Sequence, residues 1–427
     1  MMMKDCRIAI AGLGVVGAET ARHLLNRAEA LSEKAGARLI LSAISARSKG
    51  KDRGFDISGL TWCDNPVDLA DLDDIDIIVE LMGGSDGPAL ALTKAALQAG
   101  KHVVTANKAM IATHGSELAE ISEATGAQLL FESSVAGGIP ALKLLREGLA
   151  ANDVQSVSGI LNGTCNYILS TMEDTGRAFD DVLSEAQSLG YAEADPTFDV
   201  DGIDAAHKLC ILSALAFGTK PDLSKLDITG IRTVTDLDIG YAAELGYRIR
   251  LIGRATKDGV ARVAPVMMAQ DAPLAKVTGP LNAVYYEADP VNTISAVGPG
   301  AGAGPTASAV LADIIDVAAE RRNFAFGKPV ALLRQGDKQD GGAQTSCYYL
   351  RLKVTDKPGV LATVTDMLTS YEVSVESLIQ KGREDHNLVD LVMILHETTK
   401  QAMSEATKAL SQLDVVIETS DVLAVLR

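Results

Sequence analysis

The sequence predicts an α/β protein with three parts: a doubly wound domain on a parallel sheet, a mixed α+β domain, and a small βαββαβ domain at the C-terminus. Three observations lead to this prediction. Apolar segments of strand length alternate with helical patterns over residues 1–135. Residues 136–304 carry several helical patterns and then consecutive strand patterns, and residues 347–427 run through strand, helix and strand twice.

In the first domain, short apolar runs are typical of strands that are buried on both faces. We expect strands in the segments CRIAIAG, ARLILSAIS, DIDIIVELM, KHVVTAN and AQLLFESS, at residues 6–12, 37–45, 74–82, 101–107 and 127–134. Helical patterns separate them, including GAETARHLLNRAEAL at 17–31 and PALALTKAALQAG at 88–100. Strands alternating with helices predict βαβ units and a parallel sheet.

The second domain begins with a helix that Pro140 opens and a strand, VQSVSGIL. Later segments, RIRLIGRAT, VARVAPVMM and VNTISAVG, predict antiparallel strands. The helical stretch at about 305–325 is expected to return to the first domain and complete it. Residues 335–346 are polar, glycine-rich and without periodicity, so they predict a linker to the last domain, whose final strand is expected over 415–427.

Composition narrows the class of ligand. Apolar residues make up 47% of the 427 residues, enough for a large buried core, whereas aromatics make up only 4%. The net charge of −17 works against nucleic-acid binding, so a small soluble ligand is expected. Five scattered cysteines, no apolar run of about 20 residues and no clear signal-peptide cleavage site predict a cytoplasmic protein without a membrane segment.

A glycine-rich turn, GLGVVG, follows the first predicted strand and opens a helix. Glycines there permit a tight turn, close approach of a pyrophosphate and close helix packing, and the helix N-terminus offers N–H donors. We therefore predict a Rossmann-type dinucleotide site at Gly12, Gly14, Val15, Val16 and Gly17.

The end of the second strand bears on the choice of cofactor. An acid is common there in NAD sites, but this strand is followed by Arg47 and further cations, with the first acid only at Asp52. Cations suit a 2′-phosphate, so NADP is favoured over NAD, which stays open. Because the first crossover is long, the assignment of Arg47 depends on where the second strand ends.

Two further segments carry candidate catalytic groups. Thr105 and Lys108 follow the strand HVVT, at the sheet edge where ligands of α/β domains bind, so both are expected to contact the cofactor, and Lys108 can also reach a substrate oxygen. In GYAEADPTFDVDGIDAAHK, Asp204 and Lys208 are four residues apart and share one face of a helix. A surface ion pair is the simpler interpretation of that spacing, worth only about 0.3–0.5 kcal/mol. The apolar residues that follow favour a helix entering a core instead.

The same segment resembles the signature of homoserine dehydrogenases, with matches at Ala186, Gly190, Asp195, Pro196, Asp199, Gly202, Asp204 and Lys208. The segments TANK, FESSVAGGIP, LNGTCNYIL and GPGAGAGPTASAV are also similar to the family and occur in its order. The resemblance implies NAD(P)-dependent interconversion of L-homoserine and L-aspartate 4-semialdehyde by a catalytic and dimerisation domain.

The resemblance also implies roles for individual residues. Glu193 and Asp204 are expected to meet the substrate's ammonium group. Lys208 is expected to act as the acid/base and Lys108 to orient the substrate, although the reverse assignment stays open. Gly190 and Gly302 are expected to lie near the cofactor. The loop FESSVAGGIP resembles the family's sodium site, which implies a monovalent cation held by Glu132, Val135, Gly137 and Ile139.

The last domain, from its opening VTDKPGVLATVTDML, resembles an ACT domain, a ferredoxin-like module that senses amino acids. Backbone N–H groups at the turn of Asp356, Pro358 and Gly359 can bind a carboxylate. The resemblance implies inhibition by threonine and assembly into a homodimer or homotetramer. Two alternatives stay open: another amino-acid-semialdehyde oxidoreductase, and a catalytically silent NADP-sensing regulator.

Overall fold

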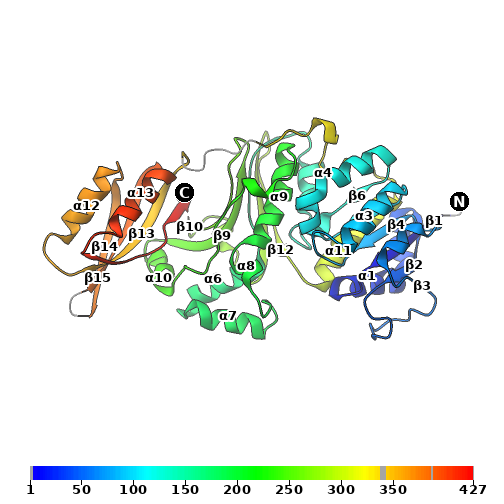
Figure 1. The fold of residues 1–427 in the computed structure, drawn as a ribbon, viewed down its shortest axis with the longest axis horizontal. Coiled ribbons are helices and arrows are strands. Elements are labelled where there is room, and N and C mark those ends of the chain that lie inside the picture. The colour runs from blue at the N-terminus through cyan, green and yellow to red at the C-terminus, as the bar shows by residue number, and fades with distance from the viewer. Residues whose placement is uncertain (1–2, 337–342, 386–387, 427) are drawn as a thin grey trace.

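The computed structural model describes residues 3–336, 343–385 and 388–426 and confirms the predicted α/β class. Figure 1 shows three units in a row, with the first domain at one end, the mixed domain in the centre and the small C-terminal domain at the other end. Among the described residues, no helix has the length and apolar character needed to cross a membrane.

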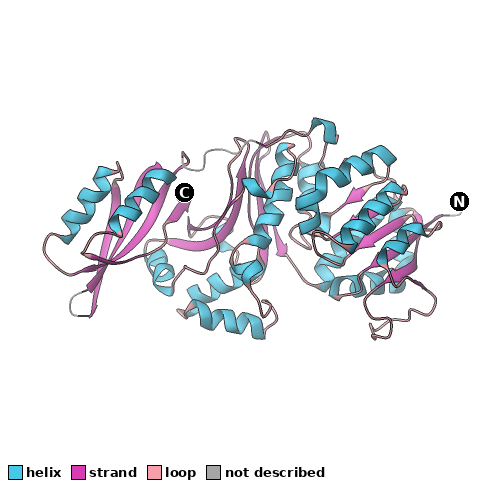
Figure 2. Ribbon diagram, viewed as in Figure 1, coloured by secondary structure: helices cyan, strands magenta, loops and turns pink. Residues whose placement is uncertain are grey.

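The first domain is a six-stranded parallel sheet in the order β3-β2-β1-β4-β5-β6, with helices on both faces (Figure 2). Its strands are β1 (Lys4–Ala11), β2 (Ala37–Ser45), β3 (Thr61–Trp62), β4 (Ile77–Glu80), β5 (His102–Thr105) and β6 (Leu129–Leu130). Its helices are α1 (Val15–Asn26), α2 (Ala28–Ala35), η1 (Pro66–Asp71), α3 (Pro88–Gln98), α4 (Lys108–Thr125) and the returning α11 (Ala303–Ala318), which packs against α1 and α2. The order reverses between β1 and β4, so ligands are expected at the carboxyl ends of these two strands.

The predicted single helix over 17–31 is wrong in one respect. The chain leaves helical geometry at Arg27 (φ −125°, ψ 22°), which separates α1 from α2. Gly36, in the left-handed region at φ +66°, then ends α2 and lets β2 begin at once. The long first crossover is therefore a second short helix, and it leaves β2 ending at Ser45.

The second domain packs helices against a sheet whose long strands are antiparallel, while the short β8 pairs parallel with β10. Its strands are β7 (Asp153–Ile160), β8 (Asp227–Ile228), β9 (Tyr247–Thr256), β10 (Ala261–Ala269), β11 (Leu281–Asp289) and β12 (Asn292–Pro299). Its longer helices are α6 (Gly163–Thr175), α7 (Phe179–Ser188), α9 (Ile203–Phe217) and α10 (Asp236–Glu244). Its short helical segments are η2 (Glu132–Ser134), α5 (Ala141–Lys143), η3 (Leu144–Gly148), α8 (Thr197–Val200), η4 (Leu223–Lys225), η5 (Leu274–Lys276) and η6 (Val330–Leu332).

The C-terminal domain has the predicted order, with β13 (Thr345–Thr355), α12 (Val360–Ser370), β14 (Val375–Asp385), β15 (Leu388–Thr399), α13 (Lys400–Leu410), β16 (Val416–Thr419) and β17 (Leu423–Leu426). The last strand predicted over 415–427 is interrupted: β16 and β17 both pair antiparallel with β13, and residues 420–422 between them leave strand geometry. Of the predicted linker at 335–346, residues 337–342 lie outside the described residues, and Thr345 already begins β13.

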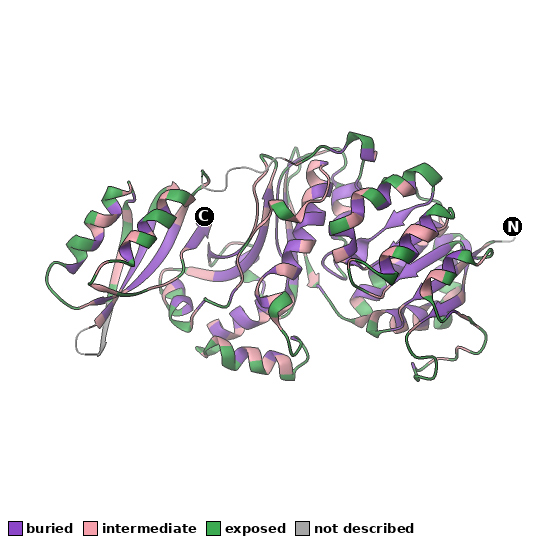
Figure 3. Ribbon diagram, in the orientation of Figure 1, coloured by how far each residue is buried: buried purple, intermediate pink, exposed green. Residues whose placement is uncertain are grey.

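The strand β17 joins the two C-terminal units. It pairs with β13 on one side and with β10 of the second domain on the other, so that one eleven-stranded sheet runs through both units. In Figure 1 the C-terminus accordingly lies beside β10. Figure 3 shows buried residues along this sheet and along the sheet of the first domain.

Candidate active site

The glycine-rich turn has the geometry that the sequence predicts for a dinucleotide loop. Gly12 has φ +96°, and a Cβ on it would lie 2.5 Å from the carbonyl oxygen of Leu81. A Cβ on Gly17 would collide with the carbonyl of Gly12, whereas Gly14 has no atom within 4 Å of that position. Gly12 and Gly17 hold the turn together, and Gly14 leaves open space at the N-terminus of α1, whose first N–H groups have no partner within the helix.

The end of β2 carries the cationic loop. Arg47 is exposed two residues after Ser45, where β2 ends. Arg53 is buried instead, and its guanidinium donates to the carbonyls of Ser48 (2.6 Å) and Lys51 (2.7 Å). Arg53 therefore holds the loop together, and Arg47 is the first of the loop's exposed cations after the strand.

A buried acid at the end of β4 was not predicted. Glu80 is fully buried and accepts from the backbone N–H groups of Met82 (2.7 Å) and Gly83 (3.3 Å) and from the Thr105 hydroxyl (2.6 Å). Thr105, a predicted cofactor contact, is itself fully buried and also accepts from the N–H of Asn107 (2.9 Å). The Thr105 side chain thus orders the loops at the carboxyl ends of β4 and β5.

Two lysines from different domains share one carboxylate. Lys108 at the start of α4 lies 2.7 Å from Asp204 Oδ1, and Lys208 lies 2.8 Å from Asp204 Oδ2. The Lys208 ammonium also donates to the carbonyl of Leu161 (2.7 Å). An ammonium has three donors, so one N–H of Lys208 is left for a ligand. Lys208 and Asp204 are buried, at 8% and 4% exposed, so the predicted i,i+4 pair is no surface ion pair.

The electrostatics of this cluster favour proton exchange at Lys208. Burial lowers the pKa of Lys208 and Lys108 adds to the effect, although Asp204 opposes both. Burial alone would raise the pKa of Asp204, but Lys208 and Lys108 hold it well below its usual range. Asp204 therefore stays ionised between them.

Glu193 and Gly190, also predicted, lie in the exposed loop between α7 and α8. The amide of Gln187 donates to the carbonyl of Glu193 (3.0 Å) and Thr164 donates to the carbonyl of Tyr191 (2.7 Å), which fixes the loop backbone. Within the described residues, no hydrogen bond or ion pair engages the Glu193 carboxylate. The structure therefore brings Lys108, Asp204 and Lys208 together and, among the described residues, shows no hydrogen bond or ion pair between them and Glu193.

The loop predicted to hold a cation touches the turn that contains Gly302. The N–H of Gly138 donates to the carbonyl of Pro299 (3.1 Å), and a Cβ on Gly137 would collide with the carbonyl of Gly300. Gly302, at φ +113°, begins α11. The described part of the chain shows no cluster of three or more histidine, cysteine or acidic residues that could hold a metal ion.

The Glu132 side chain has its own partners. It is buried and accepts from the backbone N–H groups of Leu142 and Lys143, both at 2.9 Å. Burial, with repulsion from Asp313, raises the pKa of Glu132 to about 8. In contrast, no backbone hydrogen bond within the described residues uses the carbonyls of Val135 and Gly137, which leaves both available to a ligand.

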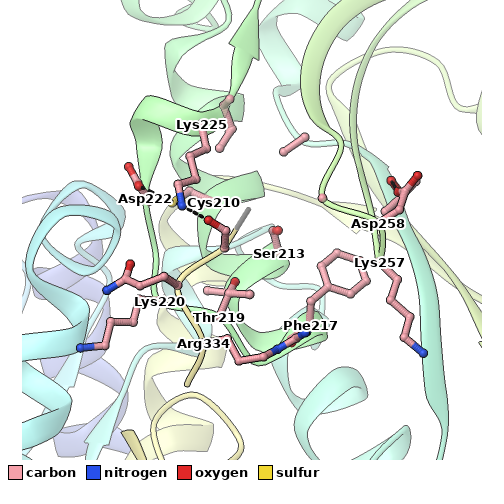
Figure 4. Close-up of a pocket in the computed structure, with 17 residues that line it drawn as sticks. Cys210, Ser213, Phe217, Thr219, Lys220, Asp222, Lys225, Lys257, Asp258 and Arg334 are labelled. Atoms are coloured by element: carbon pink, nitrogen blue, oxygen red, sulfur yellow. Dashed lines mark hydrogen bonds and ion pairs between the residues drawn. The ribbon is translucent and has the colours of Figure 1, made fainter. Parts of the chain in front are cut away.

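A polar pocket at the far end of α9 is separate from this cluster (Figure 4). Its cations already have partners: Lys225 bonds the carbonyl of Gly336, Lys220 pairs with Glu120 at 3.6 Å, and Lys257 pairs with an aspartate. We therefore place the candidate site at the Lys108–Asp204–Lys208 cluster.

Comparisons with known proteins point to one family. Three family models match: "Homoserine dehydrogenase, NAD binding domain" over 12–132, "Homoserine dehydrogenase" over 140–315 and "ACT domain" over 348–415. A homoserine dehydrogenase from Neisseria gonorrhoeae is 43% identical, with 97% of each chain covered, and one from Pseudomonas aeruginosa is 42% identical with the same coverage.

Solved structures are similar as well. The crystal structure of a homoserine dehydrogenase from Thiobacillus denitrificans aligns with a TM-score of 0.93 at 41% identity, covering 99% of each chain. A hyperthermophilic archaeal homoserine dehydrogenase in complex with NADPH aligns with a TM-score of 0.66 at 29% identity, covering 75% of this chain and 99% of that one.

Proposed function

The chain belongs to the homoserine dehydrogenase family and is an NAD(P)-dependent oxidoreductase of amino-acid biosynthesis, and from this premise we propose that Lys208 is its acid/base. The observation that carries the proposal is the buried Lys208 ammonium, fixed by Asp204 and the carbonyl of Leu161 with one donor left over. The substrates are L-homoserine and L-aspartate 4-semialdehyde. The silent-regulator alternative is not retained.

A nicotinamide cofactor held at the turn of Gly12, Gly14 and Gly17 would supply the hydride chemistry at the reacting carbon. In homoserine oxidation, neutral Lys208 accepts the proton of the substrate hydroxyl; in the reverse direction its ammonium returns the proton to the aldehyde oxygen. Lys108, 31% exposed at its side chain, orients that oxygen and keeps the proton affinity of Lys208 low. Glu193 is assigned to the substrate ammonium. Asp204, which both lysines already engage, contributes to the same end of the substrate while it holds the lysines in place.

The test is Lys208→Ala. Loss of general acid/base catalysis is expected to lower kcat by about 10²–10⁴-fold, whereas NADPH binding, followed by its fluorescence, stays within about twofold of the original. Lys208→Ala with near-normal turnover would contradict the assignment. Should Lys108→Ala alone show the larger loss of kcat, the two roles are reversed.

NADP is the proposed preferred cofactor. Arg47 supports it, because its exposed guanidinium follows the end of β2, where the 2′ position of an adenine ribose is bound in such domains. Gly12, Gly14, Gly17 and the N-terminal amides of Val15 and Val16 are assigned to the pyrophosphate. The remaining cofactor assignments go to Gly190, Gly302, Lys108 and, through the loops that it orders, Thr105.

A monovalent cation such as sodium fits the loop before α5. The carbonyls of Val135 and Gly137 are available, and oxygen ligands suit a hard cation. Glu132 and Ile139 would contribute their carbonyls, because the Glu132 carboxylate is held by two backbone amides. The ion would then tie this loop to the turn at Gly300.

Threonine inhibition is proposed for the C-terminal domain, with its ligand at the turn before α12, where Gly359 (φ +92°) begins the helix. The continuous sheet through β17 supports coupling to the catalytic domain. Homoserine-dependent NADP reduction with and without threonine tests this inhibition, and rates that do not change with threonine would leave the domain a purely structural role.

We also propose a homodimer or homotetramer and a cytoplasmic location. The location is proposed because the five cysteines are free.

A further inference from the structure

One asparagine contacts both acids beside the lysine cluster. The amide nitrogen of Asn162 donates to Asp199 Oδ1 (2.7 Å) and to Asp204 Oδ2 (2.8 Å). Its carbonyl oxygen accepts from the N–H of Cys165 (2.8 Å) and caps α6. Asn162 is only 4% exposed. The helix cap fixes which end of the amide faces the acids, so each N–H has a carboxylate of its own.

Leu161, the residue just before Asn162, contacts Lys208. The Leu161 carbonyl accepts from Lys208 Nζ (2.7 Å) and from the amide of Asn282 (2.9 Å). Asn282 packs directly against Gly300, where a Cβ would collide with its amide group. The dipeptide of Leu161 and Asn162, between β7 and α6, therefore contacts both Lys208 and its acid.

Asp204 needs such a partner because its two oxygens have different tasks. Oδ1 faces Lys108 from the first domain, whereas Oδ2 accepts from both Lys208 and Asn162. Asp199 lies close enough to share the Asn162 amide, and two carboxylates so placed repel each other. Burial, with repulsion from Asp204, raises the pKa of Asp199. The shared Asn162 donor therefore offsets the repulsion between the two carboxylates.

We propose that Asn162 is a positioning residue for the proton step: it ties Asp199 to Asp204 and thereby fixes the rotation at which Asp204 offers one oxygen to each lysine. The inference rests on the acid/base role proposed for Lys208. It assigns to the LNGT segment a task in the chemistry beyond forming a turn.

The titratable groups that act on Lys208 are Asp204 on α9, Lys108 on α4 and Asp199 on α8. Around this cluster lie Cys165 on α6, on which Asp201 after α8 also acts, and His207 on α9, which is close to Lys108 and Asp204. Burial raises the pKa of Cys165 well above its usual range, and its thiol donates to the carbonyl of Asp199 (3.2 Å). Burial, with Lys108, lowers the pKa of His207. These two groups stay neutral near pH 8, so the pH response of the site depends on the lysines and the acids.

The experiment is the pH profile of kcat/KM for homoserine in Asn162→Ser. Serine keeps a helix cap but supplies no amide donors to the acids. We expect kcat/KM at pH 8 to fall at least about tenfold, and the acid limb to move to higher pH, because the carboxylates lose a donor and attract the Lys208 proton more strongly. NADPH binding is expected to stay within about twofold.

Asn65→Ser is the matched control. Asn65 caps η1 through the N–H of Val67 (3.3 Å) and donates to Asp68 Oδ1 (2.8 Å), so it makes the same kinds of contact on the edge of the first domain. This variant is expected to leave kcat/KM and its pH profile unchanged. Asn162→Asp keeps the shape and the cap, replaces the donors by acceptors, and is expected to lose activity in the same way if the serine variant fails to fold.

The outcomes separate this inference from the proposal beneath it. Suppose that Asn162→Ser folds, binds NADPH, keeps kcat/KM within about twofold and keeps the acid limb at the same pH. Asn162 then only caps a helix, and the inference is overturned. A loss of thermal stability without a kinetic change overturns it too. If Lys208→Ala retains turnover in the same assays, the acid/base proposal itself fails.

Discussion

Replacing Asp238 by alanine is expected to destabilise the interface between the catalytic domain and the C-terminal domain by about 3–5 kcal/mol. Asp238 lies on α10, is 3% exposed, and its Oδ1 accepts from Tyr349 Oη and Arg351 Nε of β13, both at 2.8 Å. Burial acts to lower the pKa of Arg351, but Asp238 outweighs it and holds the pKa above its usual value. The variant therefore leaves a charged guanidinium, 2% exposed, without its main partner.

The assay is amide hydrogen exchange, because a chain of three domains does not unfold in one step and a global melt would not isolate this interface. Amides of β17, which bridges β10 and β13, should exchange roughly a hundredfold to several thousandfold faster in Asp238→Ala. Amides of β4 in the first domain should be unchanged. Asp201→Ala is the control, because Asp201 and its partner Arg232 are more than a third exposed and such pairs contribute under about 1 kcal/mol.

The double variant Asp238→Ala/Arg351→Met removes the stranded charge and should recover part of the loss, since an apolar side chain is often tolerated where an ion pair was buried. Exchange in β17 that is no faster in Asp238→Ala than in Asp201→Ala would refute the reasoning. The pair would then be too well hydrated to lock the two units together, and the sheet pairing alone would join them.

Three further outcomes are expected. Gly12→Ala, with φ +96° and a Cβ 2.5 Å from the Leu81 carbonyl, should cost about 1–3 kcal/mol and weaken NADPH binding at least fivefold by fluorescence titration; unchanged affinity would contradict the tight turn. Arg47→Ser should raise KM for NADP about tenfold or more and leave KM for NAD within twofold, whereas an equal change in both would show that Arg47 does not select the phosphate. Lys108→Met removes a cation that lowers the pKa of Lys208, so the acid limb of homoserine oxidation should move to higher pH; Lys108→Arg should keep the limb in place.

Much of the fold and part of the site could be predicted from patterns among residues that are close in sequence. The glycine spacing at residues 12–17 and the alternation of strands and helices depend on near neighbours, and both appear in the structure. Contacts distant in sequence were not predictable. Glu80 ends an apolar strand, and its partner Thr105 lies 25 residues away. The pairing of β17 with β10 was also missed, because periodicity identifies a strand but not its neighbour.

The i,i+4 spacing of Asp204 and Lys208 shows where such reasoning reaches its limit. Spacing places the two groups on one face of a helix, but it cannot tell a surface pair from a reactive one. The difference comes from Lys108, which α4 of the first domain brings to the second oxygen of the same carboxylate. Asp204 therefore anchors the lysine proposed as the acid/base and is also a contact between the cofactor and catalytic domains. Any shift of one domain against the other would change the distance of Lys108 from Asp204, and with it the proton affinity of Lys208.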